Sequence, residues 1–146
     1  MDVKTNKDVV RRFYEEVINQ LRLERIPELV GVEYTEVMDG RRHPVGLAGV
    51  EAHALGVRGT YPDLHLTIDR QIAEGEWVVS CVTATGTQAG EWMGMAPTGE
   101  RVTFTGVNVD RVVDGKLVEH GGAANMLGPL LAIGAIRVVG PGGPTA

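Results

Sequence analysis

Two long apolar runs joined by an Asp-Gly pair constrain the fold of this chain more than any other feature. The runs span residues 102–113 and 116–124, and Asp114-Gly115 separates them. Both central residues of a two-residue hairpin turn need positive φ, and Asp-Gly satisfies that need well. The sequence therefore predicts a tight antiparallel hairpin at this point.

Two further strands are expected upstream of this hairpin. In residues 64–72 the even positions Leu64, Leu66, Ile68 and Ile72 are apolar, which is typical of a half-buried strand. Residues 77–88 carry β-branched side chains on both faces and are expected to lie inside the sheet. Residues 89–101 form the loop that leads into the hairpin. In residues 64–72, the polar side chains of His65, Thr67 and Asp69 are expected to face solvent.

Three helices are expected before these strands. The first spans 5–21, where Thr5-x-x-Asp8 fits a capping box and apolar residues then recur at helical spacing. Two shorter ones are expected at 23–30 and 46–58. The segment 32–44 has no clean period beyond a short first strand, and 126–139 is either a short closing helix or a partner-facing segment.

This order of elements predicts an α+β fold, with helices packed over the concave face of a curved antiparallel sheet. The strands are joined mainly by hairpins, which leaves no room for parallel crossovers. Such an arrangement encloses a cone-shaped pocket, and concave apolar pockets are the usual ligand sites. A length of 146 residues favours one domain, expected at 1–139, with a flexible tail at 140–146.

Composition excludes several classes of function. Lys and Arg total 14 against 19 Asp and Glu, with no basic run longer than two, so no nucleic acid is expected as partner. No apolar run approaches the roughly 20 residues of a membrane span, and no signal peptide is recognisable, so we expect a soluble, cytoplasmic protein. Cys81, the single cysteine, is expected to be a small buried hydrophobe. No Cys/His spacing indicates a metal site.

An ordered set of short motifs runs along the chain: Arg12–Asn19, Gly46–Val50, Val57–Asp63, Thr83–Thr87, Gly90–Gly94, Pro97–Gly106 and Asp114–His120. This set resembles the SnoaL-like polyketide cyclases of the nuclear transport factor two-like superfamily. The similarity covers about residues 7–134. The resemblance implies an α+β cone, a homodimer or higher oligomer, and ring closure on a polyketide intermediate with no metal or organic cofactor.

The resemblance also implies an acid–base site from which this chain departs. Aldol-type members use a carboxylate on the last strand as general base, helped by a histidine on the preceding strand. Counted from Asp114-Gly115, those two positions are Gly122 and Asn108. Other family positions have also become small or neutral: a tryptophan is Gly121, an aspartate is Asn125 and a histidine is Gln88.

These departures favour ring closure without proton removal. Neither Gly122 nor Asn108 can accept a proton at neutral pH, and two adjacent glycines are expected to enlarge the pocket. The hypothesis is a cofactor-independent cyclase of natural-product biosynthesis that templates a pericyclic, [4+2] (Diels–Alder) closure of a largely apolar substrate. A hydrogen bond to a conjugated carbonyl would assist. The hypothesis fails if the pocket contains a carboxylate aimed at its centre.

Three residues are candidates for catalysis, each with a structural alternative. Tyr14, on the inward stripe of the first helix, donates to a substrate carbonyl or keeps its hydroxyl at the rim. Asn108 is a neutral donor or a buried amide satisfied by backbone. His120, which shares the parity of Gly122, is a general acid or base, or a histidine bonded to a neighbouring strand.

Other residues are candidates for substrate binding. His53 is expected to look into the pocket, and Trp92 with Met93 to form an apolar lid or to pack on the sheet. Arg58 is expected to be solvated or ion-paired. The remaining pocket candidates are Gln88, Gly122 and Met126.

Three alternative functions stay open. The first is an acid–base aldol cyclase or isomerase that uses Glu36, Asp39 or His120. The second is a hydroxylase-like enzyme that needs no cofactor. The third is a non-catalytic protein that binds a hydrophobic ligand.

Overall fold

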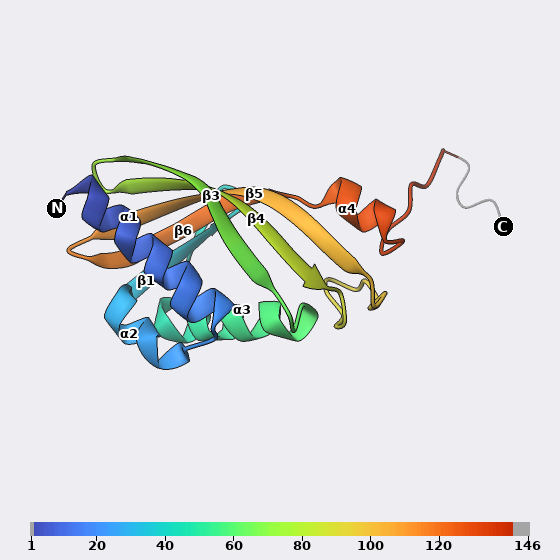
Figure 1. Cartoon of the computed structure of the whole chain (residues 1–146), viewed down its shortest axis with the longest axis horizontal. Helices are drawn as coiled ribbons and strands as arrows, with labels where there is room; N and C mark the ends of the chain where they lie inside the picture. Colours follow the sequence, from blue (N-terminus) through green and yellow to red (C-terminus); the bar gives the residue numbers. More distant parts are fainter. Residues whose placement is uncertain (1, 142–146) are drawn as a thin grey trace.

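The body of the chain is one curved, open, six-stranded sheet with helices over one face (Figure 1). The computed structural model describes residues 2–141. Its strands are β1 (Val30–Met38), β2 (Arg41–Pro44), β3 (His65–Glu74), β4 (Trp77–Thr87), β5 (Arg101–Val113) and β6 (Lys116–Asn125). Its helices are α1 (Val3–Arg12), η1 (Phe13–Asn19), η2 (Leu23–Arg25), α2 (Ile26–Leu29), α3 (Gly46–Thr60) and α4 (Leu127–Ala132). The predicted α+β class is confirmed.

The strand order is β2-β1-β6-β5-β4-β3, and β1 runs parallel to β6. The expectation of a sheet without parallel pairs was therefore wrong. The two strands are joined through most of the chain rather than by a local crossover, so connection lengths alone did not reveal the pair. A register shift between Val30 and Thr35 interrupts the alternation of β1, which explains why 32–44 has no clean period.

The first helix starts and ends differently from the sequence prediction. Its N-cap is Asp2, whose carboxylate accepts from the backbone N–H of Lys4 at 3.3 Å. The predicted capping box is wrong, because Asp8 pairs with Arg11 instead, at 2.9 Å. Leu21, with φ 54°, lies beyond the helix. The last turns, η1, are π-helical, a form that is frequent at functional sites.

The other helices and the hairpins follow the sequence closely. Helix α3 covers the predicted 46–58, and the second helix divides into η2 and α2. Asp114 and Gly115 have φ of 48° and 76°, as the tight turn requires. In β3, a bulge between Ile68 and Arg70 shifts the alternation, so Ile72 is 60% exposed rather than buried.

The core divides into two clusters at opposite ends of the sheet. The larger one packs α1 and η1 on the sheet around Val10, Val17 and Tyr34. The smaller one contains Phe104 and Leu130, so α4 is confirmed as a closing helix. Figure 1 shows α4 at the end of the molecule remote from α2. Whether this segment also meets a partner stays a prediction, as do the domain boundary and the tail, of which 142–146 lie outside the described residues.

The convex face of the sheet carries Cys81 and the apolar side chains of Val107 and Val109. Cys81 is partly exposed, so its prediction as a buried hydrophobe was wrong. The reason is the pleat: residues 78, 80 and 82 of β4 are buried, and Cys81 lies on the other face. No helix among residues 2–141 is long and apolar enough to cross a membrane.

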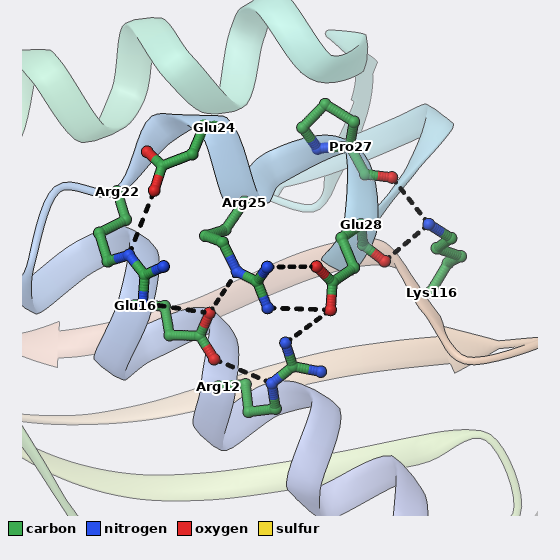
Figure 2. A network of polar contacts seen from close by, with 8 residues as sticks. All are labelled: Arg12, Glu16, Arg22, Glu24, Arg25, Pro27, Glu28 and Lys116. Atoms are coloured by element: carbon green, nitrogen blue, oxygen red, sulfur yellow. Dashed lines mark hydrogen bonds and ion pairs between the residues drawn. The ribbon is translucent and has the colours of Figure 1, made fainter.

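An ion-pair network fixes the outer side of the helical layer (Figure 2). Glu16 accepts from Arg12 and Arg25 at 2.9 and 2.6 Å, and these hydrogen bonds lower its pKa. Lys116 at the start of β6 donates to the carbonyls of Pro27 and Glu28. Exposed pairs contribute little each. Their place matters more, because residues 12 and 16 flank Tyr14 and tie the junction of α1 and η1 to η2 and α2.

Candidate active site

A row of alternating imidazoles and carboxylates crosses the sheet at one level. Register places His43 of β2 beside Glu36 of β1, Glu36 beside His120 of β6, and His120 beside Asp110 of β5. Paired residues on adjacent strands project to the same face. Asp110 contacts Tyr14 of η1, and Glu36 contacts His53 of α3, so this is the helix-covered face.

Asp110 is the buried anchor of the row. Its side chain is 0% exposed, and both of its oxygens have partners. Oδ1 lies 2.7 Å from Nδ1 of His120, and Oδ2 accepts from the Tyr14 hydroxyl at 2.7 Å. A carboxylate can only accept, so Nδ1 of His120 carries a proton and Nε2 is left for other partners. The His120 side chain is 22% exposed and can therefore meet a substrate.

This arrangement shifts the pKa of both groups that contact Asp110. Burial lowers the pKa of His120, but the Asp110 hydrogen bond and the charges of Asp110 and Glu36 outweigh it, so the net shift is upward. Burial and the Asp110 charge raise the pKa of Tyr14 well above its usual value. His120 is thus favoured as the imidazolium, while Tyr14 stays a neutral phenol that donates to Asp110.

A second histidine–carboxylate pair lies beside the first. Nδ1 of His53, on α3, is 3.2 Å from Oε1 of Glu36. The Glu36 side chain is only 12% exposed, whereas His53 is 46% exposed. Partial burial and the charge of His120 lower the pKa of His53 against the opposing effect of Glu36. The pKa values of His53 and His120 are therefore shifted in opposite directions.

The two glycines do not enlarge the site as expected. A Cβ on Gly121 would meet the Cβ of Val37 at 3.1 Å, which places this position on the outer face, beside its strand partner. A Cβ on Gly122 would lie 2.4 Å from the Val107 carbonyl oxygen and 3.0 Å from Oδ1 of Asn108. Gly122 also has a φ of 152°. No side chain fits at position 122 unless the backbone moves.

The remaining catalytic candidates lie next to the row. Asn108, the register partner of Gly122, lowers the pKa of Tyr14 against the larger upward effects of burial and Asp110. The single hydroxyl proton of Tyr14 is already donated to Asp110. Tyr14 therefore positions Asp110 in this structure. To donate to a substrate, as the sequence predicted, its hydroxyl would first have to break the hydrogen bond to Asp110.

Four predicted binding residues lie away from the row. Gln88 is fully buried, and its amide oxygen accepts from the hydroxyl and N–H of Thr98 at 2.8 and 3.2 Å, so it braces the 89–100 loop. Trp92 and Met126 pack against the smaller core cluster. Met93 has φ 49° and is 79% exposed. The substrate-binding and lid roles of these four residues stay predictions.

The structure distinguishes Glu36 from Asp39 and gives Arg58 a different set of partners from those expected. Asp39 lies in the exposed turn between β1 and β2, with φ 52°, so Glu36 is the acid that faces the site. Arg58 is partly buried, and no ion pair to it is found among residues 2–141. Its guanidinium donates to the carbonyls of Ile18, Asn19, Pro62 and Leu64 at 2.6–3.4 Å. It thereby ties the end of η1 to the segment that follows α3.

Replacement of Arg58 with methionine is expected to lower the free energy of unfolding by about 1.5–3 kcal/mol, because hydrogen bonds from a charged donor contribute that much. Urea unfolding measures the change. Arg11→Met is the matched control, since Arg11 makes one exposed pair, with Asp8, and is expected to change stability by less than about 0.5 kcal/mol. Equal effects of the two substitutions would contradict this role for Arg58.

Asp110 is the central residue that the sequence analysis missed. The available signal was its parity: even positions of β5 face inward, and a carboxylate among Phe104, Asn108 and Val112 is out of place unless it has buried partners. Among residues 2–141, no group of three or more His, Cys, Asp or Glu side chains could hold a metal ion.

A groove of about 450 Å³ lies between η1 and β3, away from the row. It shares Tyr14 with the site, but most of its lining is surface side chains such as Arg12, Glu15 and Thr67. His53 and His120 do not line it. The groups able to transfer protons face the open concave side of the sheet instead, near the exposed positions 122–125 of β6.

The fold and the row together define a class of protein: an α+β cone enzyme with proton-transfer groups on the concave face of its sheet. The model of the SnoaL-like polyketide cyclases matches residues 8–133. The chain belongs to this family, as the sequence motifs predicted. It is accordingly a polyketide cyclase of the SnoaL family, a family of antibiotic biosynthesis.

Individual relatives agree with this assignment. Aklanonic acid methyl ester cyclase DnrD of Streptomyces peucetius is 28% identical over 136 residues, covering 90% of this chain and 92% of DnrD. AclR of Streptomyces galilaeus, a candidate hydroxylase, is 28% identical, with a TM-score of 0.80 over 96% of this chain and 91% of AclR. IdmH of Streptomyces antibioticus, a candidate polyketide cyclase, is 26% identical, with a TM-score of 0.74 over 90% and 99%.

Proposed function

We propose that this enzyme closes a carbon ring in a polyketide by acid–base catalysis, with His120 as the group that donates a proton to the acceptor carbonyl. The observation that carries the proposal is the 2.7 Å contact that holds His120 against the fully buried Asp110. A histidine whose ring is oriented by a carboxylate and whose second nitrogen is free is a common general acid or base.

His120 suits the role of the acid. Ring closure by aldol addition turns a carbonyl oxygen into an alkoxide, which needs a proton as its charge develops. The raised pKa of His120 keeps the imidazolium populated near neutral pH, so a proton is available at Nε2. The name of DnrD, a cyclase of aklanonic acid methyl ester, supports a polyketide carrying carbonyl groups as the substrate class.

Templated [4+2] closure is the second candidate, and the glycine at position 122 favours it. The carboxylate that aldol-type relatives use is absent there, and the neutral Asn108 lies opposite. One observation weighs against it: the site contains the carboxylate of Glu36, only 12% exposed and on the concave face. A carboxylate on this face supports acid–base chemistry, so templated closure ranks second.

A pH profile of ring closure separates the two candidates. With a linear poly-β-ketoester surrogate, we expect kcat/KM to fall as pH rises above the ordinary histidine value of 6.5, because His120 must be protonated and its pKa is raised. Mass spectrometry should show a product of unchanged mass. A flat profile between about pH 5 and 9, with conversion of a conjugated polyene surrogate, would establish templated closure instead. Oxygen uptake with a heavier product would establish hydroxylation, as the likeness to AclR suggests.

A further inference from the structure

The pair formed by His53 and Glu36 has no part in the proton donation assigned to His120. His53 and Glu36 reach the same row as His120 and Asp110, but from the other side: His53 comes from α3, and Tyr14 from η1. Glu36 and His120 are register partners on adjacent strands, and such strands lie about 4.8 Å apart. Both imidazoles can therefore reach atoms of one bound substrate.

The two pairs share their geometry but differ in electrostatics. In each, Nδ1 faces a carboxylate and Nε2 is left free. Opposite displacement of two pKa values in one site is the usual sign of a division between acid and base. The downward shift at His53 favours the neutral imidazole, whereas the upward shift at His120 favours the imidazolium.

We propose that His53, positioned by Glu36, is the general base that removes the α-proton of the substrate while His120 protonates the acceptor oxygen. This inference rests on the proposed function. It assigns to α3 and β1 the base that the last strand lacks at Gly122. It also names the substrate class: a carbon acid between two carbonyl groups, since an imidazole is too weak to deprotonate a simple ketone.

The step is balanced without any added reagent. Nε2 of His53 takes the proton from the carbon between the carbonyls, and the electron pair of that C–H bond forms the enolate. The enolate carbon then bonds to the acceptor carbonyl carbon, whose π pair moves to oxygen. That oxygen takes the proton from Nε2 of His120. One C–C bond is formed, and His53 ends protonated while His120 ends neutral. Transfer of a proton from His53 to His120 through water restores both, so the net change is one proton moved from carbon to oxygen and the mass is unchanged.

The charged and titratable groups around His53 come from each element packed against it. Glu36 on β1 raises its pKa, and His120 on β6 lowers it. His43 on β2 lies beside Glu36, Asp110 on β5 lies beyond His120, and Tyr34 on β1 is a buried neutral phenol. The expected profile is a bell, with a rising limb below pH 6.5 from His53 and a falling limb above it from His120.

Exchange of the α-hydrogen tests the base separately from ring closure. The probe is a β-ketoester surrogate without an acceptor carbonyl, incubated with enzyme in D₂O and followed by proton NMR. We expect wild type to exchange the α-proton in this assay. His53→Gln should exchange about 10²- to 10⁴-fold more slowly. His65→Gln, on the exposed face of β3, is the matched control and should exchange like wild type.

Glu36→Gln adds a readout that a merely structural role would not alter. Because Glu36 raises the pKa of His53, its loss should move the rising limb of the ring-closure profile to lower pH. Circular dichroism confirms folding, and half-exposed His53 tolerates the amide. Normal exchange in folded His53→Gln, or an unmoved limb in Glu36→Gln, would overturn the role of this pair. If the role of His53 is overturned but His120→Gln loses ring closure, the proposed function stands without a role for His53. If His53→Gln and His120→Gln both close the ring normally, both proposals are wrong.

Discussion

Replacing His120 with glutamine is expected to lower kcat for ring closure by about 10²- to 10⁴-fold, the usual contribution of a general acid. Glutamine keeps most of the volume and a polar end but cannot transfer a proton at neutral pH. Because His120 acts on the oxygen that gains charge in the transition state, KM is expected to change little. Steady-state rates with the poly-β-ketoester surrogate, measured across pH, give both quantities. The falling limb above pH 6.5 should disappear with the imidazole.

Asp110→Asn tests the cause of this effect while the imidazole stays in place. Without the carboxylate, burial is the largest remaining influence, so the pKa of His120 should fall below its ordinary value of 6.5. Imidazole resonances in NMR report that shift directly, and the falling limb should move to lower pH with it. A His120 pKa unchanged by Asp110→Asn, or full activity of His120→Gln, would contradict the assignment.

The same pair has a consequence for stability. A raised pKa in the folded state means that protonated His120 stabilises the fold. This contribution is complete below the unfolded value near 6.5 and is lost as pH rises through the folded pKa. The stability difference between wild type and His120→Gln should therefore shrink as the solution becomes more alkaline.

Restoring the family carboxylate with Gly122→Asp is expected to destabilise the protein by about 1–3 kcal/mol and to leave ring closure no faster. A Cβ at this position meets the Val107 carbonyl oxygen at 2.4 Å and the Asn108 Cα at 3.0 Å, so β5 and β6 must separate. The φ of 152° adds strain for any residue with a side chain. Urea unfolding and the ring-closure assay give the two results.

Two glycine-to-alanine variants separate backbone strain from the effect of the added charge. Gly122→Ala has the same Cβ clash and should lose about as much stability as Gly122→Asp. Gly128→Ala, where a Cβ meets nothing within 4 Å, should be neutral or slightly stabilising. If Gly122→Asp is stable and turns over faster, a carboxylate on β6 can still serve as the general base. That result would contradict the assignment of the acid–base groups to the neighbouring elements.

Much of the fold was predictable because it rests on local signals. The Asp114-Gly115 turn, the alternation of β5 and the apolar stripe of the first helix each act within a few residues. The register shifts were not predictable in this way. A bulge in β3 turned Ile72 outward, and the irregular β1 left the register of Glu36 ambiguous. Single-residue shifts reverse the face of every later side chain.

The candidate site was predictable residue by residue but not as an arrangement. Parity placed His120 on the face of Gly122, and spacing placed Tyr14 on the inner stripe. Asp110 was missed because a charge in an apolar strand has meaning only when its partners are known, and those are 96 and 10 residues away in the chain. His53 and Glu36 likewise lie on different elements, α3 and β1, so local spacing does not reveal their contact.

The sequence by itself therefore determined the α+β class, the family and the absence of a carboxylate at position 122. Composition, periodicity and turn chemistry are properties of short segments, and they survive without tertiary contacts. Only the tertiary structure decided which acids and imidazoles meet. The parallel pairing of β1 with β6 brings Glu36 beside His120. Burial of His120 lowers its pKa, but the hydrogen bond and charge of Asp110, which lies buried beneath Tyr14 of η1, raise it overall. Proton chemistry depends on distances of a few ångströms between residues far apart in the chain, and the fold sets those distances.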